Sequence, residues 1–483
     1  MIDSGALPMG WSLVPLGELL TAIDSGKSFK CEERPPEAHE VGVIKVSAVS
    51  WGEYQESESK TCVDVDRIEP TNFVRPGDFL FSRANTIELV GACVIVGRVS
   101  RRLMLSDKIL RLHYATADLK PWVLQYLRSK AGRDQIELLA SGNQESMRNI
   151  GQERLKQIQI PLPPSNERES ISFKLDELLS QLAAASNELS TAQRKLNLYR
   201  QSLLKSAVEG ALTAEWRGEP TEVDMETGAA SADGWAATPN SWRWSTAEAE
   251  CGFITKGTTP PKSLTSDGEK CVPFLRVTNL TRDGSLNFSD QVFVAEDVHR
   301  KFLARSIVRP GDVLMNIVGP PLGQVSMVPS TFPEWNVNQA IAIFRVQPGL
   351  LNEFLAFVLL SPGAGRWLQA RAKTTAGQTN LTLEVCRGLP VPVPPLAEQA
   401  EIVRLLNQQL EALTEQARAI DRAIAMAAAQ RQNILRAAFS GQLVPQDPND
   451  EPASVLLERI RAQRNAATDK PSAQRSRRAK ISA

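Results

Sequence analysis

Apolar residues recur at alternating steps of four and three along two long segments, each of which follows a proline tract. This heptad spacing predicts one apolar stripe on each of two helices of about 40 residues. We expect the helices to pair antiparallel within the chain, because the intervening residues let the chain return and an intramolecular contact costs less entropy. An intermolecular coiled coil is the alternative. The helix-pairing positions are Ile171, Leu175, Leu178, Leu182, Leu189, Leu196, Leu203, Ile402, Leu406, Leu413, Ile420 and Ile434.

Outside these helices the apolar pattern changes to shorter runs. Residues 91–99 are rich in valine and isoleucine and predict a strand, whereas residues 119–139 and 350–370 have helical periodicity. The proline tracts, residues 161–164 and 392–395, end these mixed parts, since proline continues neither a helix nor a central strand. Each globular part therefore mixes α and β structure.

The two halves of the chain repeat each other. Trp11 matches Trp242, 231 positions later, and the motif VRPGD recurs from Val74 and Val308, 234 positions apart, which implies an insertion that is later reversed. Proline fixes φ and glycine supplies a positive φ in this motif, so it predicts a turn with an architectural role. The other matched pairs are Val46 with Val277, Asn149 with Asn380, Pro164 with Pro395 and Gly210 with Gly441.

The repeat predicts an α+β protein with two pseudo-symmetric mixed α/β domains, separated by two long antiparallel coiled-coil helices. The basic tail, from Arg464 onward, is expected to be disordered. The expected segments are 1–160 and 241–391 for the domains, 161–213 and 392–442 for the proline tracts with their helices, 214–240 for an acidic linker, and 443–483 for a C-terminal segment with the tail.

Composition narrows the classes of function. Lysine plus arginine and aspartate plus glutamate both number 55, so any DNA site must be local rather than a whole-surface polycation. Six cysteines lie singly without a CxxC pair and only three histidines are present, which indicates neither a metal site nor a disulfide framework. No run of about 18 apolar residues and no signal peptide is apparent, so a cytoplasmic protein without a membrane anchor is expected.

The ordered motifs of the two halves resemble the specificity subunit of type I restriction-modification systems over nearly the whole chain. No single string is diagnostic, but the ordered set occurs twice. The strings that carry the resemblance are residues 77–96 and 311–328, the NQAIAIFRV strand, residues 377–403 with the first-half counterpart IPLPPSNERESI, the helix ends LLKSAVEGALT and ILRAAFSGQLV, and residues 451–464.

The resemblance implies a subunit without catalytic activity, whose two target recognition domains each read one half of a split DNA sequence. It also implies docking of two modification subunits and of motor-nuclease restriction subunits; S-adenosylmethionine, ATP and magnesium would belong to those partners, with no cofactor in this chain. The sequence agrees, because no methyltransferase NPPY-like tetrad, no GxxxxGK[ST] loop and no convincing nuclease cluster is found. We therefore expect no catalytic residues.

Base-edge readout needs polar or basic side chains on exposed segments, and three loops at matched positions supply them. Residues that differ between the halves, Arg83 with Asn85 against Asn316 with Gln324, are the better specificity candidates. Asn380 and its counterpart Asn149 equally fit a cap or turn. The candidates are Lys27, Ser28 and Lys30 against Lys256, Thr258, Thr259 and Lys262; Ser82, Arg83 and Asn85 against Asn316 and Gln324; and Asn143, Gln144 and Arg148 against Thr375, Gln378, Thr379 and Asn380.

Two other functions stay open at this point. The chain can serve a stand-alone methyltransferase that lacks a restriction partner, or it can be a coiled-coil adaptor whose heads bind proteins, which zero net charge permits. The tryptophans are expected in cores or as linker anchors rather than as base-stacking platforms.

Overall fold

The structure, a computed structural model, falls into two compact units. The first unit takes the chain up to Glu188 together with the residues from Ala423 onward, and the second takes residues 189–422. Lys262, most of the acidic linker and most of the basic tail lie outside the described residues. The described residues are 7–144, 147–218, 235, 237–261, 265–266, 271–281, 283–375 and 378–468.

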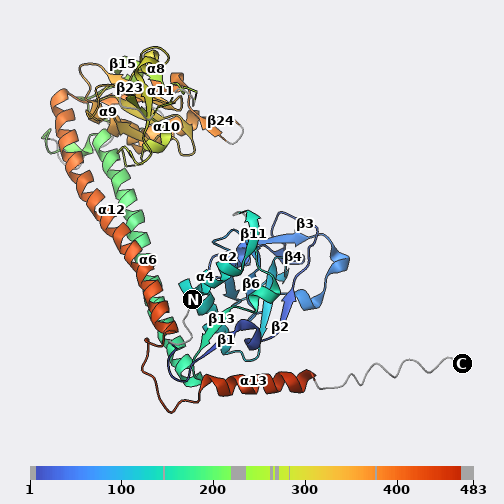
Figure 1. The fold of residues 1–483 in the computed structure, drawn as a ribbon. Helices are drawn as coiled ribbons and strands as arrows, with labels where there is room; N and C mark the ends of the chain where they lie inside the picture. Colours follow the sequence, from blue (N-terminus) through green and yellow to red (C-terminus); the bar gives the residue numbers. More distant parts are fainter. Residues whose placement is uncertain are drawn as a thin grey trace. The chain divides into compact units, whose positions relative to one another are not determined.

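Four sheets and several helices build the globular part of the first unit (Figure 1). The central sheet has the order β2-β10-β6-β8, a second has the order β3-β5-β4-β9, a third has the order β11-β12-β7, and β1 pairs with β13. The strands are β1 (Ser12–Pro15), β2 (Leu20–Ser25), β3 (Cys31–Glu32), β4 (Val41–Ile44), β5 (Ser59–Cys62), β6 (Phe79–Ser82), β7 (Ala84–Asn85), β8 (Cys93–Ile95), β9 (Arg102–Met104), β10 (Ile109–Tyr114), β11 (Ser141–Gln144), β12 (Met147–Asn149) and β13 (Gln159–Leu162). The helices are α1 (Leu16–Leu19), α2 (Ser47–Ser50), α3 (Leu119–Arg128), α4 (Lys130–Leu139) and α5 (Gln152–Leu155).

The second unit repeats this topology, with orders β15-β23-β19-β21, β16-β18-β17-β22, β20-β25-β24 and β14-β26, which confirms the duplicated α+β fold. Its strands are β14 (Arg243–Thr246), β15 (Cys251–Lys256), β16 (Thr265–Ser266), β17 (Cys271–Leu275), β18 (Val292–Ala295), β19 (Val313–Asn316), β20 (Val318–Gly319), β21 (Val325–Met327), β22 (Asn336–Val337), β23 (Ile341–Val346), β24 (Lys373–Thr375), β25 (Gln378–Asn380) and β26 (Pro390–Val393). Its helices are α7 (Ala247–Glu250), α8 (Glu296–Arg300), α9 (Asn352–Leu360), α10 (Pro362–Arg371) and α11 (Leu383–Arg387).

The central strand of each main sheet is buried on both faces, which explains its uninterrupted apolar sequence. In β6, Phe79 and Phe81 pack into one hydrophobic core and Leu80 packs into another on the opposite face. In β19, Val313 packs into one core and Leu314 packs into another on the opposite face. Alternate side chains of a strand point to opposite faces, so both sets must be apolar when both faces are covered.

The VRPGD motif forms the turn before this strand in both units, as the sequence predicts. Gly77 and Gly311 have φ of +82° and +86°, a backbone conformation that favours glycine. The following aspartate holds the turn: the Asp78 carboxylate accepts a hydrogen bond from the Arg75 backbone N–H at 2.8 Å, and the Asp312 carboxylate accepts one from the Arg309 N–H at 2.8 Å. Each carboxylate also pairs with an arginine of the neighbouring strand.

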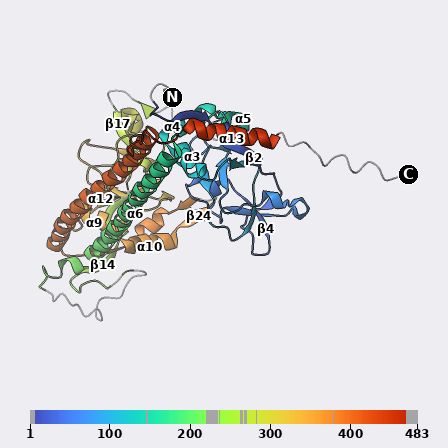
Figure 2. The ribbon, with the colours of Figure 1, turned by 90° about the horizontal axis from the view of Figure 1, so that it is seen from below.

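The two long helices, α6 (Ser165–Val208) and α12 (Leu396–Phe439), are both 44 residues long and lie side by side (Figures 1 and 2). Within the first unit the start of α6 packs against the end of α12, and within the second unit the end of α6 packs against the start of α12. The pair is therefore antiparallel, as predicted.

Burial along the predicted apolar stripe is graded. Ile171, Leu175, Leu203, Ile402, Leu406, Leu413 and Ile434 are buried, whereas Leu178, Leu182, Leu189, Leu196 and Ile420 are half-buried. The buried positions belong to the hydrophobic cores that the domains share with the helices. Leu178, Leu182 and Leu196 pack against the edges of these cores, where less of each side chain is covered.

A tryptophan fixes each domain to the beginning of its own helix. The Trp11 indole donates a hydrogen bond to Glu167 at 2.9 Å, and the Trp242 indole donates one to Glu398 at 2.9 Å. Each unit also contains the end of the other long helix. In the first unit Gly441, which follows α12 and has a positive φ, lies close to Pro8; in the second unit Gly210, which follows α6, lies close to Pro239. These matched joints explain why Trp11 and Gly210 keep a constant offset from their counterparts.

The C-terminal segment adds one helix to the first unit, α13 (Ala453–Thr468). Leu457 and Ile460 are buried in the first core, and the Arg461 guanidinium forms an ion pair with Glu18 at 2.6 Å. Arg464 donates to the Gly17 carbonyl at 3.2 Å. The expectation that the tail is disordered from Arg464 is therefore wrong at its start, because the apolar stripe of this segment has a surface to pack on.

Candidate nucleic-acid interface

A three-stranded sheet in the first unit brings two of the candidate loops together. β7 pairs with β12, so that Asn85 lies opposite Arg148 and Ala84 lies opposite Asn149. The Ile150 N–H donates to the Arg83 carbonyl at 2.9 Å, and the Arg83 guanidinium donates to the Asn149 side chain at 3.4 Å. Loops that are about 60 residues apart in the sequence thus form one surface.

The third strand of that sheet, β11, completes the surface. It pairs with β12, and Arg148 donates to the Gly142 carbonyl at 2.8 Å. Asn143 and Gln144 belong to β11, but their side chains lie outside the described part of the chain. The hairpin formed by β11 and β12 therefore presents Arg148 beside Arg83 and Asn85.

The second unit builds the same sheet from different residues. Gly319 of β20 lies opposite Thr379 of β25, and the Leu381 N–H donates to the Ile317 carbonyl at 2.9 Å. Gln378 is exposed and Asn380 is half-buried, while the side chain of Thr375 is not described. By position on the sheet, the counterparts of Arg83, Asn85 and Arg148 are Ile317, Gly319 and Thr379.

Two candidates are not on the surface. Asn316 is fully buried, and its side chain donates to the Pro321 carbonyl at 2.5 Å and accepts from the Gln324 N–H at 2.8 Å. Ser82, at the equivalent place in the first unit, is also fully buried. The expectation that Asn316 reads DNA needs correction, because its amide braces the turn after β19; Gln324 also donates inward, to the Leu280 carbonyl at 3.1 Å.

The remaining candidate loop follows β2 in the first unit and β15 in the second, the equivalent strands of the two main sheets. Gly26 and Gly257 precede it, and a Cβ on either would lie 2.3 Å or less from a backbone oxygen of the adjacent segment, so glycine alone fits there. Lys27 forms an ion pair with Glu69, and the Thr258 hydroxyl accepts from Arg305. No hydrogen bond or ion pair joins this loop to the three-stranded sheet among the residues that the structure describes. Ser28, Lys30, Lys256 and Thr259 also lie in or next to these loops, whereas Lys262 is outside the described residues.

The alternative interpretation of the matched asparagines as helix caps is wrong. Asn149 and Asn380 are the last residues of β12 and β25. The next helices begin later and have Gly151 and Thr382 as their N-caps. Both asparagines therefore stay on the candidate sheet.

Sequence reasoning missed two exposed apolar side chains near this sheet. Trp51, which follows α2, is 62% exposed, and the preceding Ser50 hydroxyl accepts a hydrogen bond from the Asn85 amide at 3.3 Å. Met147 of β12 is 58% exposed. Most tryptophans are indeed buried, such as Trp122 and Trp335, but Trp51 is not, and neither composition nor periodicity distinguishes it.

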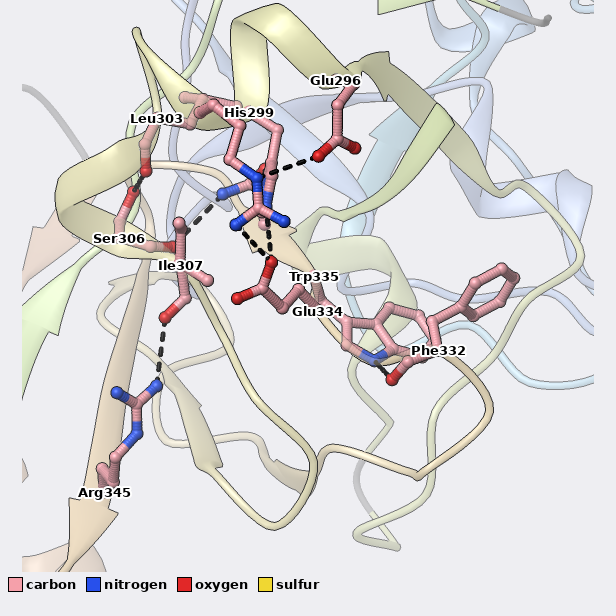
Figure 3. Close-up of polar contacts among 11 residues, drawn as sticks. Glu296, His299, Leu303, Ser306, Ile307, Phe332, Glu334, Trp335 and Arg345 are labelled. Atoms are coloured by element: carbon pink, nitrogen blue, oxygen red, sulfur yellow. Dashed lines mark hydrogen bonds and ion pairs between the residues drawn. The ribbon is translucent and has the colours of Figure 1, made fainter. Parts of the chain in front are cut away.

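The second unit also contains a buried polar cluster away from the sheet (Figure 3). His299 of α8 is fully buried, and its ring nitrogens lie 2.7 Å from the Asn336 side-chain oxygen and 3.1 Å from the Glu334 carboxylate. The hydrogen bond from His299, together with the Arg300 charge, lowers the pKa of Glu334. Because every partner lies within the unit, the cluster ties α8 to β22 and to the segment before it.

The potential metal ligands and the cysteine thiols of the described residues are the groups that a metal or thiol site would use. The described residues contain no group of three or more histidine, cysteine or acidic side chains placed to hold a metal ion. Burial raises the pKa of the Cys93 thiol to about 11 and those of Cys251 and Cys386 to about 12, which keeps them protonated at neutral pH. None of the described helices combines the length and apolar composition that a membrane crossing needs.

The chain is similar to known proteins of one kind, the specificity subunits of type I restriction enzymes. Residues 250–421 match the family model described as "Type I restriction modification DNA specificity domain". The EcoBI specificity subunit of Escherichia coli is 28% identical over 346 residues, which are 68% of this chain and 70% of the relative. The EcoKI specificity subunit of E. coli strain K12 is 23% identical over 97% of this chain and 98% of its own. The chain is thus similar to type I restriction-modification specificity subunits, and residues 250–421 match the family model of their DNA specificity domain.

A solved structure has the same fold as this chain. A chain from a study titled "Structural basis underlying complex assembly and conformational transition of the type I R-M system" superposes with a TM-score of 0.62 at 20% identity, over 90% of this chain and 99% of that chain. The family model falls on the second unit, and the first unit has the same sheet orders. The chain thus carries the fold of the matched domain twice.

Proposed function

We propose that this chain is a specificity subunit and reads a bipartite, gapped DNA sequence, one half with each unit, through the three-stranded sheets. The observation that supports this most is the contrast between matched scaffolds and unmatched reading positions. The two sheets have the same strand order, yet Arg83, Asn85 and Arg148 of the first are replaced by Ile317, Gly319 and Thr379 in the second. Equal scaffolds that read unlike half-sites should differ where bases are touched.

The chemistry of modification and cleavage then belongs to partner subunits. We infer that two modification subunits, which use S-adenosylmethionine, and restriction subunits, which use ATP and magnesium, dock on the subunit. The long helices support this, because their half-buried apolar stripe and exposed apolar residues such as Phe173 and Met426 offer contact area. The chain itself acts as a non-catalytic specificity subunit.

Methylome sequencing of a host that expresses the chain with its modification partner tests the proposal. Adenine methylation at a gapped, non-palindromic motif that disappears without this chain is the expected result. A continuous palindromic motif would contradict two half-sites. Methylation with no restriction of unmodified phage would support the stand-alone methyltransferase alternative, and no methylation together with capture of other proteins would support an adaptor.

A further inference from the structure

The second unit contains a cavity of about 370 Å³ beside its candidate reading sheet. The loop after β20 contributes Pro320 and Leu322, α10 contributes Gly365, Leu368 and Gln369, and β25 contributes Thr379. We call this cavity the Gly365 pocket. Its volume falls in the range of roughly 300–1,000 Å³ that is typical of ligand sites. α10 lies near β24, a strand of the candidate reading sheet (Figure 1).

The pocket exists because α10 has a glycine where the first unit has an arginine. Ser129 and Ser361 are the N-caps of α4 and α10, and each hydroxyl accepts a hydrogen bond from the N–H three residues later. Four residues after the cap, α4 has Arg133 and α10 has Gly365. A Cβ on Gly365 would meet nothing within 4 Å. Space for a side chain is therefore open in the second unit.

In the first unit the arginine fills that space. The Arg133 guanidinium donates to the Val90 carbonyl and, at 3.1 Å, to the Ile87 carbonyl, which both belong to the loop between β7 and β8. This loop corresponds to the one that supplies Pro320 and Leu322 to the pocket. The two units thus share the surrounding elements and differ in whether the space between them is occupied.

The lining determines which chemical group the pocket takes. Pro320, Leu322 and Leu368 make its walls largely apolar, and transferring a phosphate against such walls would cost desolvation energy without a compensating charge. The Gln369 side-chain amide is exposed and has no hydrogen-bond partner among the described residues. An apolar wall with one free amide fits the edge of a base. Among bases in the major groove, thymine presents an apolar 5-methyl group.

The position of the pocket favours DNA over a protein partner. One wall is Thr379, which occupies the sheet position that Arg148 holds in the first unit. Two copies of one partner subunit would dock on features that both units share, and the Gly365 pocket is not shared. A difference between the units is instead what unlike half-sites require.

We propose that the Gly365 pocket receives the 5-methyl edge of a thymine in the half-site that the second unit reads. The methyl group contacts Pro320, Leu322 and Leu368, and the Gln369 amide faces the same or the neighbouring base. This inference rests on the proposed function and adds to it a specificity-determining feature with a defined base.

Replacing thymine by uracil tests the pocket, because it removes only the methyl group. The full chain in complex with its modification partner is titrated with duplexes carrying the recognised sequence, with uracil at one thymine at a time. For one thymine of one half-site, we expect affinity to fall about fourfold, the effect of one buried methyl group. Gly365→Arg should abolish this discrimination by supplying the side chain that the first unit has, and Gly365→Ala should keep it. Discrimination within the other half-site should not change in either variant.

The outcomes separate this proposal from the proposed function. Binding to a gapped motif with no effect of uracil at any position, or a half-site without thymine, would overturn the pocket proposal and leave bipartite reading intact. Loss of co-purified modification subunit in Gly365→Arg, with the uracil effect unchanged, would assign the pocket to a protein partner. A wild-type complex without sequence-specific binding would overturn both.

Discussion

At the scale of single residues, the two joints between domain and helix have the same geometry but different charges. Glu167 accepts a second hydrogen bond from the neutral Gln446 amide at 3.3 Å. Glu398 instead accepts from the Thr213 hydroxyl at 2.8 Å and forms a buried ion pair with Arg217, whose side chain is 8% exposed. A buried charge that loses its partner is costly, so the second joint should be the more sensitive.

We expect Glu398→Gln to lower the free energy of unfolding by about 3 kcal/mol, since it removes the buried carboxylate that pairs with Arg217. Glu167→Gln, the matched control, should cost only about 1 kcal/mol, the value of a neutral hydrogen bond. Urea titration measures the loss of stability in each variant. Hydrogen exchange should show that the loss caused by Glu398→Gln is located in the second unit. Equal losses in the two variants would contradict this account.

The cluster around Glu334 predicts a dependence of stability on pH. The pKa of Glu334 is lowered in the folded chain, chiefly by the hydrogen bond from His299. The Glu334 carboxylate therefore stabilises the fold fully at pH values above its ordinary pKa of 4.5. That contribution is lost as the pH falls through the lowered folded pKa. Unfolding of Glu334→Gln and wild type, measured from pH 7 to pH 3, should show a stability gap that narrows below about pH 4.5. A gap that is constant with pH would exclude the carboxylate as its source.

At the scale of elements, the three-stranded sheet concentrates the candidate readers on a two-stranded hairpin and one short strand. The hairpin of β11 and β12 is fixed at its base by the Ile150 N–H bond to Arg83, and the equivalent hairpin in the second unit is fixed by Leu381 and Ile317. A rigid base with variable side chains lets the readout change without disturbing the fold.

Arg148→Ala should therefore weaken specific binding by about 1–3 kcal/mol and relax specificity at one position of the first half-site. The control is Arg154→Ala on α5, an exposed arginine outside the sheet that donates a hydrogen bond to the Leu139 carbonyl at 3.2 Å. That control should leave the recognised sequence unchanged. Titration of the complex with single-base variants of the site measures both effects; an Arg148→Ala subunit with unaltered affinity and specificity would remove Arg148 from the interface.

At the scale of the whole molecule, the duplication makes the two globular parts exchangeable. The segments from the start of β1 to the end of β13, residues 12–162, and from β14 to β26, residues 243–393, begin and end at matched positions. The tryptophan–glutamate bonds at the two joints, Trp11–Glu167 and Trp242–Glu398, lie just outside these segments and stay in place when a segment is replaced. The helices should therefore accept either part at either place.

A chain in which residues 243–393 are replaced by a second copy of residues 12–162 should direct methylation to an inverted repeat of the first half-site, with an unchanged gap, because the antiparallel helices hold the two globular parts through equivalent joints. Methylome sequencing of a host that carries this duplicated chain and the modification partner measures the recognised sequence. The unchanged parent chain is the control. A recognised sequence identical to the parent's would show that the helices, rather than the globular parts, carry the specificity.

The sequence by itself determined the repeat, the antiparallel helix pair and the turn at VRPGD. These follow from local rules: heptad spacing, the φ values of proline and glycine, and a constant offset between Trp11 and Trp242. The candidate loops were also found, since polar residues between apolar runs mark exposed segments. Which loops meet was not determined, because strand pairing between distant residues such as Asn85 and Arg148 leaves no local signal.

Only the tertiary structure decided which polar residues face the solvent. Asn316 has the composition of a reader, but it is buried because the turn after β19 needs its amide, and Trp51 has the composition of a core residue but is exposed. The Gly365 pocket depends on a missing side chain, which becomes visible only when α10 is compared with the Arg133-filled space beside α4. Burial and empty volume are properties of the packed chain as a whole, so no single segment of sequence encodes them.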